Sequence, residues 1–493
     1  MDKYILAIDQ GTTSTRAIIF SKDGKIINQA SEEITQYYPK NGYVEHNATE
    51  IFSKTLAVML QVVVSSNLNF NQIETVGITN QRETIVVWDK KTQLPVYNAI
   101  VWQSNQSKDV CEEYRQYEDL IKEKTGLLLN PYFSATKLRW LFNNYPDIEK
   151  RAFNGELLCG TIDSWLIYKL TGGKVHKTDY SNASRTLLFN INTATWDDDL
   201  LKLFNIPRCI LPEISSSNSW FGYIDKSVIP FNIPITGVLG DQQAALFGQC
   251  CFEKGELKNT YGTGCFTLLN TGDNICKSKH GLLTTVAWNI DGKISYALEG
   301  SVFIGGAAVQ WLRDGLRMIK KSADSEKYAT AVESSDGVYL VPSFTGLGTP
   351  YWDADVKGAM FGLTRATNKE IFIRATLEAI AYQCKDVIRT MVEDSNIELK
   401  SLCVDGGATD NSFLMQFQAD ILECEIILQK TKESTALGAA LIAGLGVGIY
   451  NNLDEIKKLK AVKKTFIPKM DKEEVKRLYD GWLKAIKSTI SFK

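Results

Sequence analysis

The stretch of the chain that decides the fold is YILAIDQGTTSTRAIIF, residues 4–20. Its two ends, Tyr4–Asp9 and Arg16–Phe20, are mostly apolar and flank a polar segment that contains Gly11. This pattern predicts two strands joined by a turn, and a third strand is expected over Lys25–Ala30. Because the strand pattern begins at once, without a basic and then apolar leader, we expect no signal peptide.

The first turn is rich in hydroxyl groups. Behind Asp9 come Gly11 and four hydroxyl side chains, those of Thr12, Thr13, Ser14 and Thr15. A tight turn directs backbone N–H groups toward one point, and hydroxyls add donors, as in an anion-binding nest. Asp9, at the strand end, suits Mg²⁺ held through water, since Mg²⁺ takes few carboxylates and retains waters. The alternative is a polar turn that binds nothing, and the Walker pattern GxxxxGK[ST] is absent from the sequence.

Beyond residue 40 the hydrophobic pattern alternates between helix and strand. A helix is predicted over Thr49–Ser65 with Thr49 as its N-cap, and strands over Val76–Thr79 and Thr84–Trp88. Further helices are expected over Lys108–Thr125, Ser134–Asn144 and Asp163–Leu170, with a buried one within Leu437–Tyr450. This mixture indicates the α/β class.

A second cycle of the same kind begins after about residue 250. A hairpin is predicted over Asn259–Gly272, and a strand ending in Asp405-Gly406-Gly407 precedes a helix over Ser412–Leu422. The stretches 9–12 and 405–408 echo each other, as strand, Asp and glycine turn. We therefore predict two related domains, 1–249 and 250–493, that face a shared cleft, although strand-Asp-Gly turns are common.

Three further turns of small residues follow strands or precede a helix. They are Gly262-Thr263-Gly264, Gly305-Gly306 and Gly406-Gly407-Ala408. Glycine turns let a nucleotide approach the backbone closely, but each alone is more often structural. Together with the first turn they favour a nucleotide cleft.

Polar and aromatic residues of the first domain suit a polyhydroxylated substrate. Arg82 donates hydrogen bonds and Glu83 accepts them, and Trp102 can supply a flat apolar wall. Phe266 and the hydroxyl of Tyr132 are candidates of the same kind. The alternative for the ion pair is a solvated loop, and for the aromatic residues it is the core.

Asp241 follows the apolar run Ile235–Leu239 and precedes a short helix over Ala244–Gly248. The carboxyl end of a strand is where α/β enzymes place their chemistry. A kinase needs one carboxylate to accept the proton of the acceptor hydroxyl, and Asp241 is the candidate. The alternative is a helix cap.

Composition excludes several classes of partner. The 493 residues carry a net charge of -2, which gives no basic field for nucleic acid or anionic lipid. No apolar run reaches the roughly 18 residues typical of a transmembrane helix, so we expect no membrane insertion. The ten cysteines form no CxxC pair and the three histidines lie far apart, which predicts reduced thiols, no zinc site and a cytoplasmic protein.

These motifs, in this order, resemble the glycerol kinases of the FGGY carbohydrate kinase family along the whole chain. The resemblance is carried by the following stretches: residues 4–14, 80–83, 100–103, 131–134 with Lys137 and Trp140, 178–186, 240–248, 259–266, 405–408 and 437–440. It implies an actin-like fold of two ribonuclease-H-like domains around a catalytic cleft. It also implies ATP and Mg²⁺ as cofactors, glycerol as substrate and a homodimer or homotetramer.

The resemblance further implies roles by position. Asp241 would be the general base, and Asp9 and Asp241 would position Mg²⁺. Glycerol would contact Arg82, Glu83, Trp102, Tyr132, Asp241, Gln242 and Phe266. The nucleotide would contact Thr12, Thr13, Ser14, Arg16, Thr263, Gly306, Gln310, Gly407 and Asn411. The alternatives are another FGGY kinase, for xylulose or gluconate, and an actin-like or Hsp70-like switch ATPase.

Overall fold

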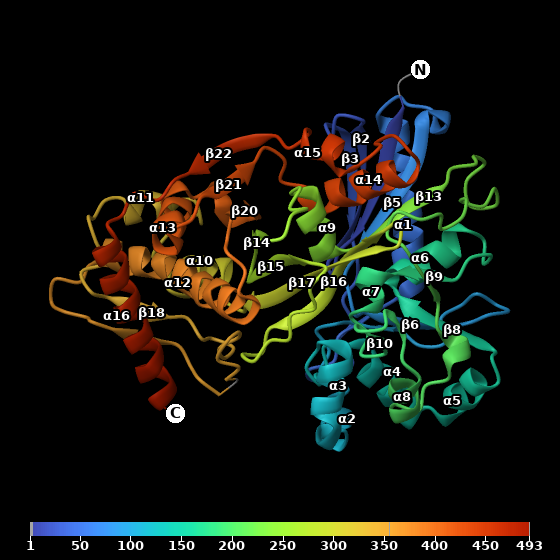
Figure 1. The fold of residues 1–493 in the computed structure, drawn as a ribbon, viewed down its shortest axis with the longest axis horizontal. Helices are drawn as coiled ribbons and strands as arrows, with labels where there is room; N and C mark the ends of the chain where they lie inside the picture. The colour runs from blue at the N-terminus through green and yellow to red at the C-terminus, as the bar shows by residue number, and fades with distance from the viewer. Residues whose placement is uncertain (1–2, 354, 493) are drawn as a thin grey trace.

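The computed structural model describes residues 3–353 and 355–492, which form two large mixed sheets with helices around them (Figure 1). The predicted hairpin is confirmed: β1 (Tyr4–Gln10) pairs antiparallel with β2 (Ser14–Ser21), and β3 (Ile26–Glu33) pairs with β2. On its other side β1 runs parallel to β5 (Ile73–Asn80), which runs parallel to β13 (Ile235–Gly240). The order of this first sheet is β3-β2-β1-β5-β13.

The second sheet has the same order over five of its strands. β14 (Glu256–Tyr261) pairs antiparallel with β15 (Cys265–Gly272), and β15 pairs antiparallel with β17 (Lys293–Val302). On its other side β14 runs parallel to β20 (Ser401–Asp405), next to β21 (Ile426–Gln429). The strands β16 (Leu283–Ile290) and β22 (Val462–Phe466) extend the two edges.

Comparison of the two strand orders confirms related halves but corrects the echo seen in the sequence. The turn at Gly11 joins β1 to β2. Its counterpart in the second sheet is the turn at Gly262–Gly264, which joins β14 to β15. Asp405 instead ends the fourth strand, as Asn80 does in the first sheet. Pairing Asp9 with Asp405 was therefore wrong, because similar turns follow strands at different places in the two sheets.

Two helices that follow the fifth strands pack against each other at the junction of the halves. They are α9 (Asp241–Gly248) and α14 (Ser434–Gly446), and α14 also lies on β1, β5 and β13. The approach is so close that a Cβ on Gly438 would lie 1.8 Å from the carbonyl oxygen of Ala244. Only glycine fits at position 438. Most of α14 is buried, which confirms the buried helix predicted within Leu437–Tyr450.

Helix α1 (Ala48–Ser65) covers the first sheet. Its N-cap is Asn47, whose side chain accepts from the Thr49 and Glu50 amides, so the expected Thr49 cap is wrong by two residues. By length and composition α1 is the one helix of the described residues that meets the requirements of a membrane span. Its apolar face, with Ile51 and Val58, is fully buried in the core under the first sheet.

A smaller sheet, of order β4-β7-β6-β8, lies beside the first one. The predicted helix over 134–144 is confirmed as α4 (Ser134–Asn144). The one expected over 108–125 is instead broken into α2 (Lys108–Glu113), a 3₁₀ turn and α3 (Glu118–Thr125). The other helices and strands of this region are β4 (Glu45–His46), β6 (Ile85–Asp89), β7 (Ala99–Ile100), α5 (Pro146–Phe153), β8 (Leu157–Thr161), α6 (Ile162–Leu170), β9 (Lys177–Asp179), α7 (Tyr180–Ala183), β10 (Phe189–Asn190), β11 (Thr195–Trp196), α8 (Asp198–Leu203) and β12 (Glu213–Ser215).

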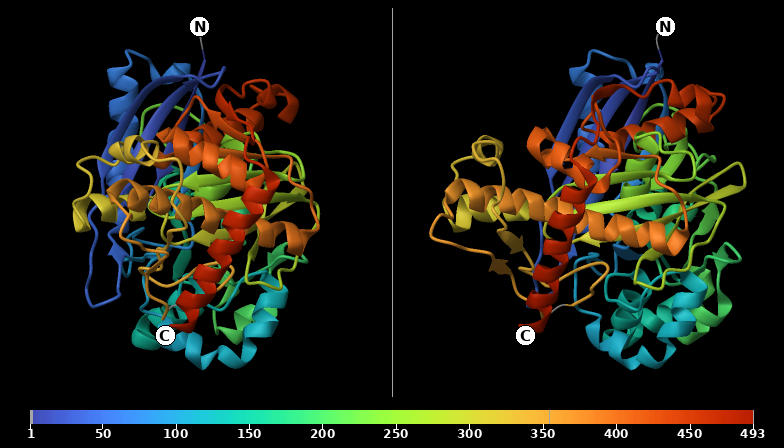
Figure 2. Two further views of the ribbon diagram at one scale, coloured as in Figure 1. Left: turned by 90° about the vertical axis from the view of Figure 1, so that its left-hand side faces the viewer. Right: turned by 60° about the vertical axis from the view of Figure 1, so that its left-hand side comes forward.

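Apart from α14, the longer helices of the second half pack mainly within that half. The long helix α12 (Lys369–Ser395) packs on β15 and β17, and α16 (Lys472–Ser491) runs to the C-terminus (Figure 2), away from the first sheet (Figure 1). The predicted helix over 412–422 is confirmed as α13 (Ser412–Leu422). Shorter elements are α10 (Gly306–Gln310), a π turn over Trp311–Gly315, α11 (Asp324–Ala329), β18 (Tyr339–Val341), β19 (Ala359–Phe361) and α15 (Leu453–Lys457).

Candidate active site

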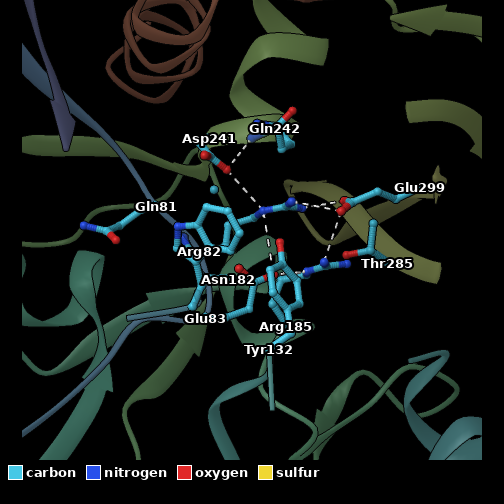
Figure 3. A network of polar contacts seen from close by, with 12 residues as sticks. Gln81, Arg82, Glu83, Tyr132, Asn182, Arg185, Asp241, Gln242, Thr285 and Glu299 are labelled. Atoms are coloured by element: carbon cyan, nitrogen blue, oxygen red, sulfur yellow. Dashed lines mark hydrogen bonds and ion pairs between the residues drawn. The ribbon is translucent and has the colours of Figure 1, made fainter. Parts of the chain in front are cut away.

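The structure brings Arg82, Glu83 and Asp241 together at one edge of the first sheet. Arg82 and Glu83 follow β5, and Asp241 follows the neighbouring parallel strand β13, so both loops leave the sheet at the same edge. Arg82 Nε lies 3.1 Å from Asp241 Oδ1 (Figure 3). The Arg82 and Glu83 side chains are almost fully buried, whereas that of Asp241 is 30% exposed. Asp241 is therefore the accessible carboxylate of the group.

Two charged residues that the sequence analysis did not single out complete this group. Glu299, from β17 of the second sheet, accepts hydrogen bonds from Arg82 Nη1 at 2.6 Å and from Arg82 Nη2 at 3.0 Å. It also accepts a hydrogen bond from Arg185 Nη2 at 3.1 Å, and Arg185 Nε donates one to Glu83 at 2.6 Å (Figure 3). We call these five residues, Arg82, Glu83, Arg185, Asp241 and Glu299, the acceptor cluster. Its charges alternate in sign from Glu83 to Asp241.

Burial and pairing set the charge states within the acceptor cluster. Burial acts to raise the pKa of Glu299, but Arg185 and Arg82 outweigh it and hold the pKa at about 2. Burial raises the pKa of Glu83, with Arg185 and Arg82 opposing it. For Arg82 burial acts to lower the pKa, but Glu299 and Glu83 bring it well above its ordinary value. Glu299 is thus the carboxylate of the cluster whose ionised form the two arginines stabilise most clearly.

Trp102 and Tyr132 lie beside one another near the cluster. Their ring centroids are 5.5 Å apart in an edge arrangement, and the Arg185 guanidinium lies 5.8 Å from the Tyr132 ring. Trp102 Nε1 donates to Thr12 Oγ1 at 2.9 Å, which ties this aromatic wall to the first turn. Phe266 is half-buried on β15, opposite Thr260 and Ser301 in its sheet. Its role as a second wall stays a prediction.

The loop that carries Tyr132 is held by a buried lysine. Lys137, in the first turn of α4, is inaccessible and donates to the carbonyl oxygens of Pro131 at 2.8 Å, of Tyr132, and of Phe133 at 3.2 Å. Burial lowers the pKa of Lys137 to about 7, with Glu83 opposing the shift. Three carbonyls on one ammonium fix the path of the loop and hence the position of Tyr132.

A second charged residue of the second half, Lys258, contacts Gln242. Lys258, fully buried on β14, donates through Nζ to Gln242 Oε1 at 2.5 Å and to Thr260 Oγ1 at 3.0 Å. Burial lowers the pKa of Lys258 to about 8, while Asp405 and Glu299 oppose that. The second sheet therefore contributes one buried acid and one buried base to a site whose other polar residues belong to the first half.

The turn after β1 is held from behind by a neutral network. Gln81 Nε2 donates to the Gly11 carbonyl oxygen at 3.0 Å, and Gln36 Nε2 donates to that of Thr12 at 2.9 Å. Both glutamines meet His46, whose Nε2 lies 2.8 Å from Gln36 Oε1 and whose Nδ1 lies 3.3 Å from Gln81 Nε2. Burial lowers the pKa of His46 to about 4, so the ring is neutral. The side chains of Thr13 and Ser14 remain accessible in this turn.

Asp9 lies at the end of β1 and pairs with Arg16 Nη2 at 2.9 Å, and Arg16 in turn pairs with Glu433 at 2.7 Å. Burial raises the pKa of Asp9 to about 6; Arg16 acts to lower it, and Asp241 and Glu433 add to the rise. The carboxylate oxygens of Asp9 and Asp241 are hard donors of the kind that Mg²⁺ prefers. Asp9 and Asp241 thus fit the ion that the sequence predicts.

A cavity of about 480 Å³ lies in the second half. It is lined by the turn at Gly262-Thr263, the start of α10, α11 and the segment after β20. All five residues predicted there for the nucleotide line it: Thr263, Gly306, Gln310, Gly407 and Asn411. Of residues not predicted, Val309, Leu377 and Leu414 give it apolar walls, and Ser325 accepts from Asn411 Nδ2 at 3.3 Å.

Comparison with known proteins matches this arrangement. Residues 4–248 match the N-terminal domain of the FGGY family of carbohydrate kinases, and residues 257–447 match its C-terminal domain. The chain belongs to this family. As a member of the FGGY family it is an ATP-dependent kinase with the two-domain fold that its sheets show.

Individual relatives of this FGGY kinase cover its whole length. The glycerol kinases of Bacillus licheniformis and Bacillus subtilis are 58% and 57% identical to it, each over all of both chains. The solved structure of Plasmodium falciparum glycerol kinase with ADP has a TM-score of 0.95 and 39% identity, over 99% of this chain and 98% of that one. Gluconate kinase from Lactobacillus acidophilus, at 22% identity and a TM-score of 0.90, shares the fold.

Proposed function

We propose that the protein is a glycerol kinase, which transfers the γ-phosphoryl group of MgATP to glycerol and yields sn-glycerol 3-phosphate and ADP. The observation that carries the proposal is full-length identity of 57–58% to curated glycerol kinases. The acceptor cluster supports it, because a buried set of charged donors and acceptors suits a small polyol and disfavours apolar molecules.

In this reaction Asp241 accepts the proton of the hydroxyl that attacks. Its carboxylate is the accessible one of the acceptor cluster, and it stands at the start of α9. Arg82 Nε, 3.1 Å away, holds Oδ1 and leaves the remainder of the carboxylate to the substrate. Arg82, Glu83, Tyr132 and Gln242 hydrogen-bond the hydroxyls of glycerol, while Trp102 and Phe266 pack on its carbons.

The nucleotide binds between the first turn and the cavity of the second half. The accessible hydroxyls of Thr12, Thr13 and Ser14 donate hydrogen bonds to phosphate oxygens. Arg16 and the turn at Thr263 bind the phosphates as well. The nucleoside is bound by Gly306, Gln310, Gly407 and Asn411. Asp9 and Asp241 hold Mg²⁺, which when bound neutralises charge on the phosphates.

The two halves divide the work in this proposal. Residues 1–249 bind glycerol and the phosphates, and residues 250–493 bind the adenine nucleotide. Closure of one half on the other excludes water, which would otherwise compete with glycerol for the phosphoryl group. A cytoplasmic location and a homodimer or homotetramer belong to the same proposal, by likeness to family members.

The test is MgATP turnover in a coupled ADP-release assay with glycerol, dihydroxyacetone, xylulose, gluconate or no acceptor. We expect turnover that depends on glycerol, with little background. Preference for xylulose or gluconate would replace glycerol in the proposal and retain the family. ADP release that is independent of any acceptor would instead favour a switch ATPase of the actin or Hsp70 kind.

A further inference from the structure

We propose that Glu299, on β17 of the second sheet, is a positioning residue for the acceptor site of the first half. It holds Arg82 in the orientation that leaves Asp241 free to act as base. The inference rests on the proposed kinase function and concerns a residue that contacts neither the proposed acceptor nor the nucleotide directly.

Glu299 accepts hydrogen bonds from both terminal nitrogens of Arg82 and from one terminal nitrogen of Arg185. Its two oxygens receive Arg82 Nη1 at 2.6 Å and Nη2 at 3.0 Å, a fork that fixes the plane of the guanidinium. The same carboxylate receives Arg185 Nη2 at 3.1 Å (Figure 3). With Arg82 held along this edge, only its Nε side faces Asp241.

Electrostatics explains why an anion is needed at this place. The acceptor cluster contains two guanidinium groups, each with almost no exposure, and Glu83 is the only other carboxylate of the cluster that is as deeply buried. Without Glu299, Arg82 would lack its bidentate partner and would turn toward the remaining carboxylates. Asp241, already 3.1 Å from Nε, is the nearer of the two, because Glu83 lies 3.9 Å from the same nitrogen.

The position of Glu299 in the chain adds a second consequence. Arg82 and Asp241 follow strands of the first sheet, but β17 belongs to the sheet that also carries the nucleotide turn at Gly262–Gly264. A change in the relative placement of the two sheets therefore alters the fork on Arg82. Through the Glu299 carboxylate, the orientation of Arg82 in the acceptor site depends on the position of the nucleotide-binding half relative to the first half.

The experiment compares Glu299→Gln and Glu299→Asp with the unaltered protein in steady-state assays with MgATP and glycerol. Gln keeps the shape and removes the charge; Asp keeps the charge but withdraws the carboxylate by one methylene. Because misplacement by about 1 Å can cost ~10²-fold in rate, we expect kcat/KM for glycerol to fall about 100-fold in Glu299→Gln. We expect an intermediate loss in Glu299→Asp, with KM for ATP unchanged in both.

A matched control separates positioning from stability. Glu378 on α12 is a buried glutamate of the same half, paired with Arg374 at 2.8 Å, whose guanidinium also donates to backbone carbonyls. Glu378→Gln likewise replaces a buried carboxylate by the neutral amide, and it should leave kcat per folded molecule unchanged. Should Glu299→Gln fail to fold, Glu299→Asp carries the test, since it retains the negative charge between the two arginines.

Normal glycerol kcat/KM in folded Glu299→Gln, or in Glu299→Asp where only that variant folds, would overturn the proposal. So would an equal rise in KM for ATP and for glycerol, which indicates general damage. The unaltered protein is assayed first with the full set of acceptors. If its acceptor proves to be another polyol or sugar, the proposed substrate fails, and the same two variants then test Glu299 with that acceptor.

Discussion

The acceptor cluster and the nucleotide cavity handle polar ligands by opposite means. In the acceptor cluster, four charged side chains are almost fully buried and pair with one another in a fixed order. In the nucleotide cavity, Thr263, Gln310 and Gly407 are exposed, and much of the wall is backbone or small side chains. The first region is organised before any substrate arrives, whereas the second offers space that a ligand fills.

This difference has a physical reason. A small polyol offers few atoms, so selectivity depends on hydrogen bonds that are fixed in direction and costly to leave unpaired. A nucleotide offers large apolar and anionic surfaces, which glycine turns and apolar walls accommodate through close approach. Substitutions in the acceptor cluster should therefore affect chemistry and selectivity, while those near the turns should affect nucleotide affinity.

The largest effect is expected for Asp241→Asn. The amide cannot accept the proton, and general-base catalysis typically contributes ~10²–10⁴-fold, so kcat should fall by about that factor. Binding of ATP, measured by calorimetry, should remain because Asn is isosteric and the cavity is unchanged. A variant that retained nearly full kcat would exclude Asp241 as the base.

The next effect concerns Asp9 and depends on pH. Its pKa in the folded protein is about 6, above the unfolded value of 3.8, so ionised Asp9 lowers the stability of the metal-free protein. The penalty is absent below the unfolded pKa, grows as pH rises toward 6 and is constant above it. Asp9→Asn should therefore raise the melting temperature at pH 8 and leave it nearly unchanged near pH 4.

Activity should follow the opposite direction at this residue. Since Mg²⁺ is bound by the ionised carboxylate, kcat/KM for MgATP in the unaltered protein should decline as pH falls below about 6. Excess Mg²⁺ should move this decline to lower pH, and Asp9→Asn should be nearly inactive throughout. A profile that is flat through pH 6 and insensitive to Mg²⁺ would remove Asp9 from the metal site.

A smaller effect is expected for Tyr132→Phe. One neutral hydrogen bond contributes about 0.5–1.5 kcal/mol, so KM for glycerol should rise by no more than roughly tenfold. KM for ATP should not change. Tyr168→Phe is the control, since the Tyr168 hydroxyl donates to the Lys90 carbonyl in the same half, outside the acceptor cluster. Equal effects of the two substitutions would mean that Tyr132 does not contact the acceptor.

The sequence was informative where function depends on short local patterns. The hairpin at Gly11, the glycine turns and the position of Asp241 after a strand were all predicted, because strand, turn and helix start leave signals within a few residues. Of the five predicted nucleotide residues on one cavity, Thr263, Gly306 and Gly407 lie in those turns, whereas Gln310 and Asn411 were predicted only from the resemblance to the family. Local patterns also misled, since the Asp-Gly echo joined turns that the strand order separates.

The acceptor cluster was only half predictable, for a topological reason. Glu299 stands alone in a buried strand and meets Arg82 across 217 positions of the chain, so no spacing connects them. Its one signal was a single acid next to the apolar run Tyr296–Leu298, and an acid that is buried there requires a partner. Lys258, equally buried on β14, stood among other polar residues of its strand and offered not even that signal.

The smallest effect is expected at His46, behind the first turn. Through Gln36 and Gln81 this neutral ring supports the carbonyls of Gly11 and Thr12, so His46→Leu should release the turn without touching a ligand. We expect KM for ATP to rise severalfold and KM for glycerol to rise less.

The matched control for His46 is His176, a half-buried histidine whose pKa is also lowered to about 4, mainly by desolvation. Its Nε2 donates instead to the Cys159 carbonyl at 2.8 Å. His176→Leu should reduce stability to a similar degree and leave both KM values unchanged. If the two variants raise KM for ATP equally, the turn does not depend on the His46 network, and the contrast between a charged acceptor site and a neutral phosphate turn loses its functional meaning.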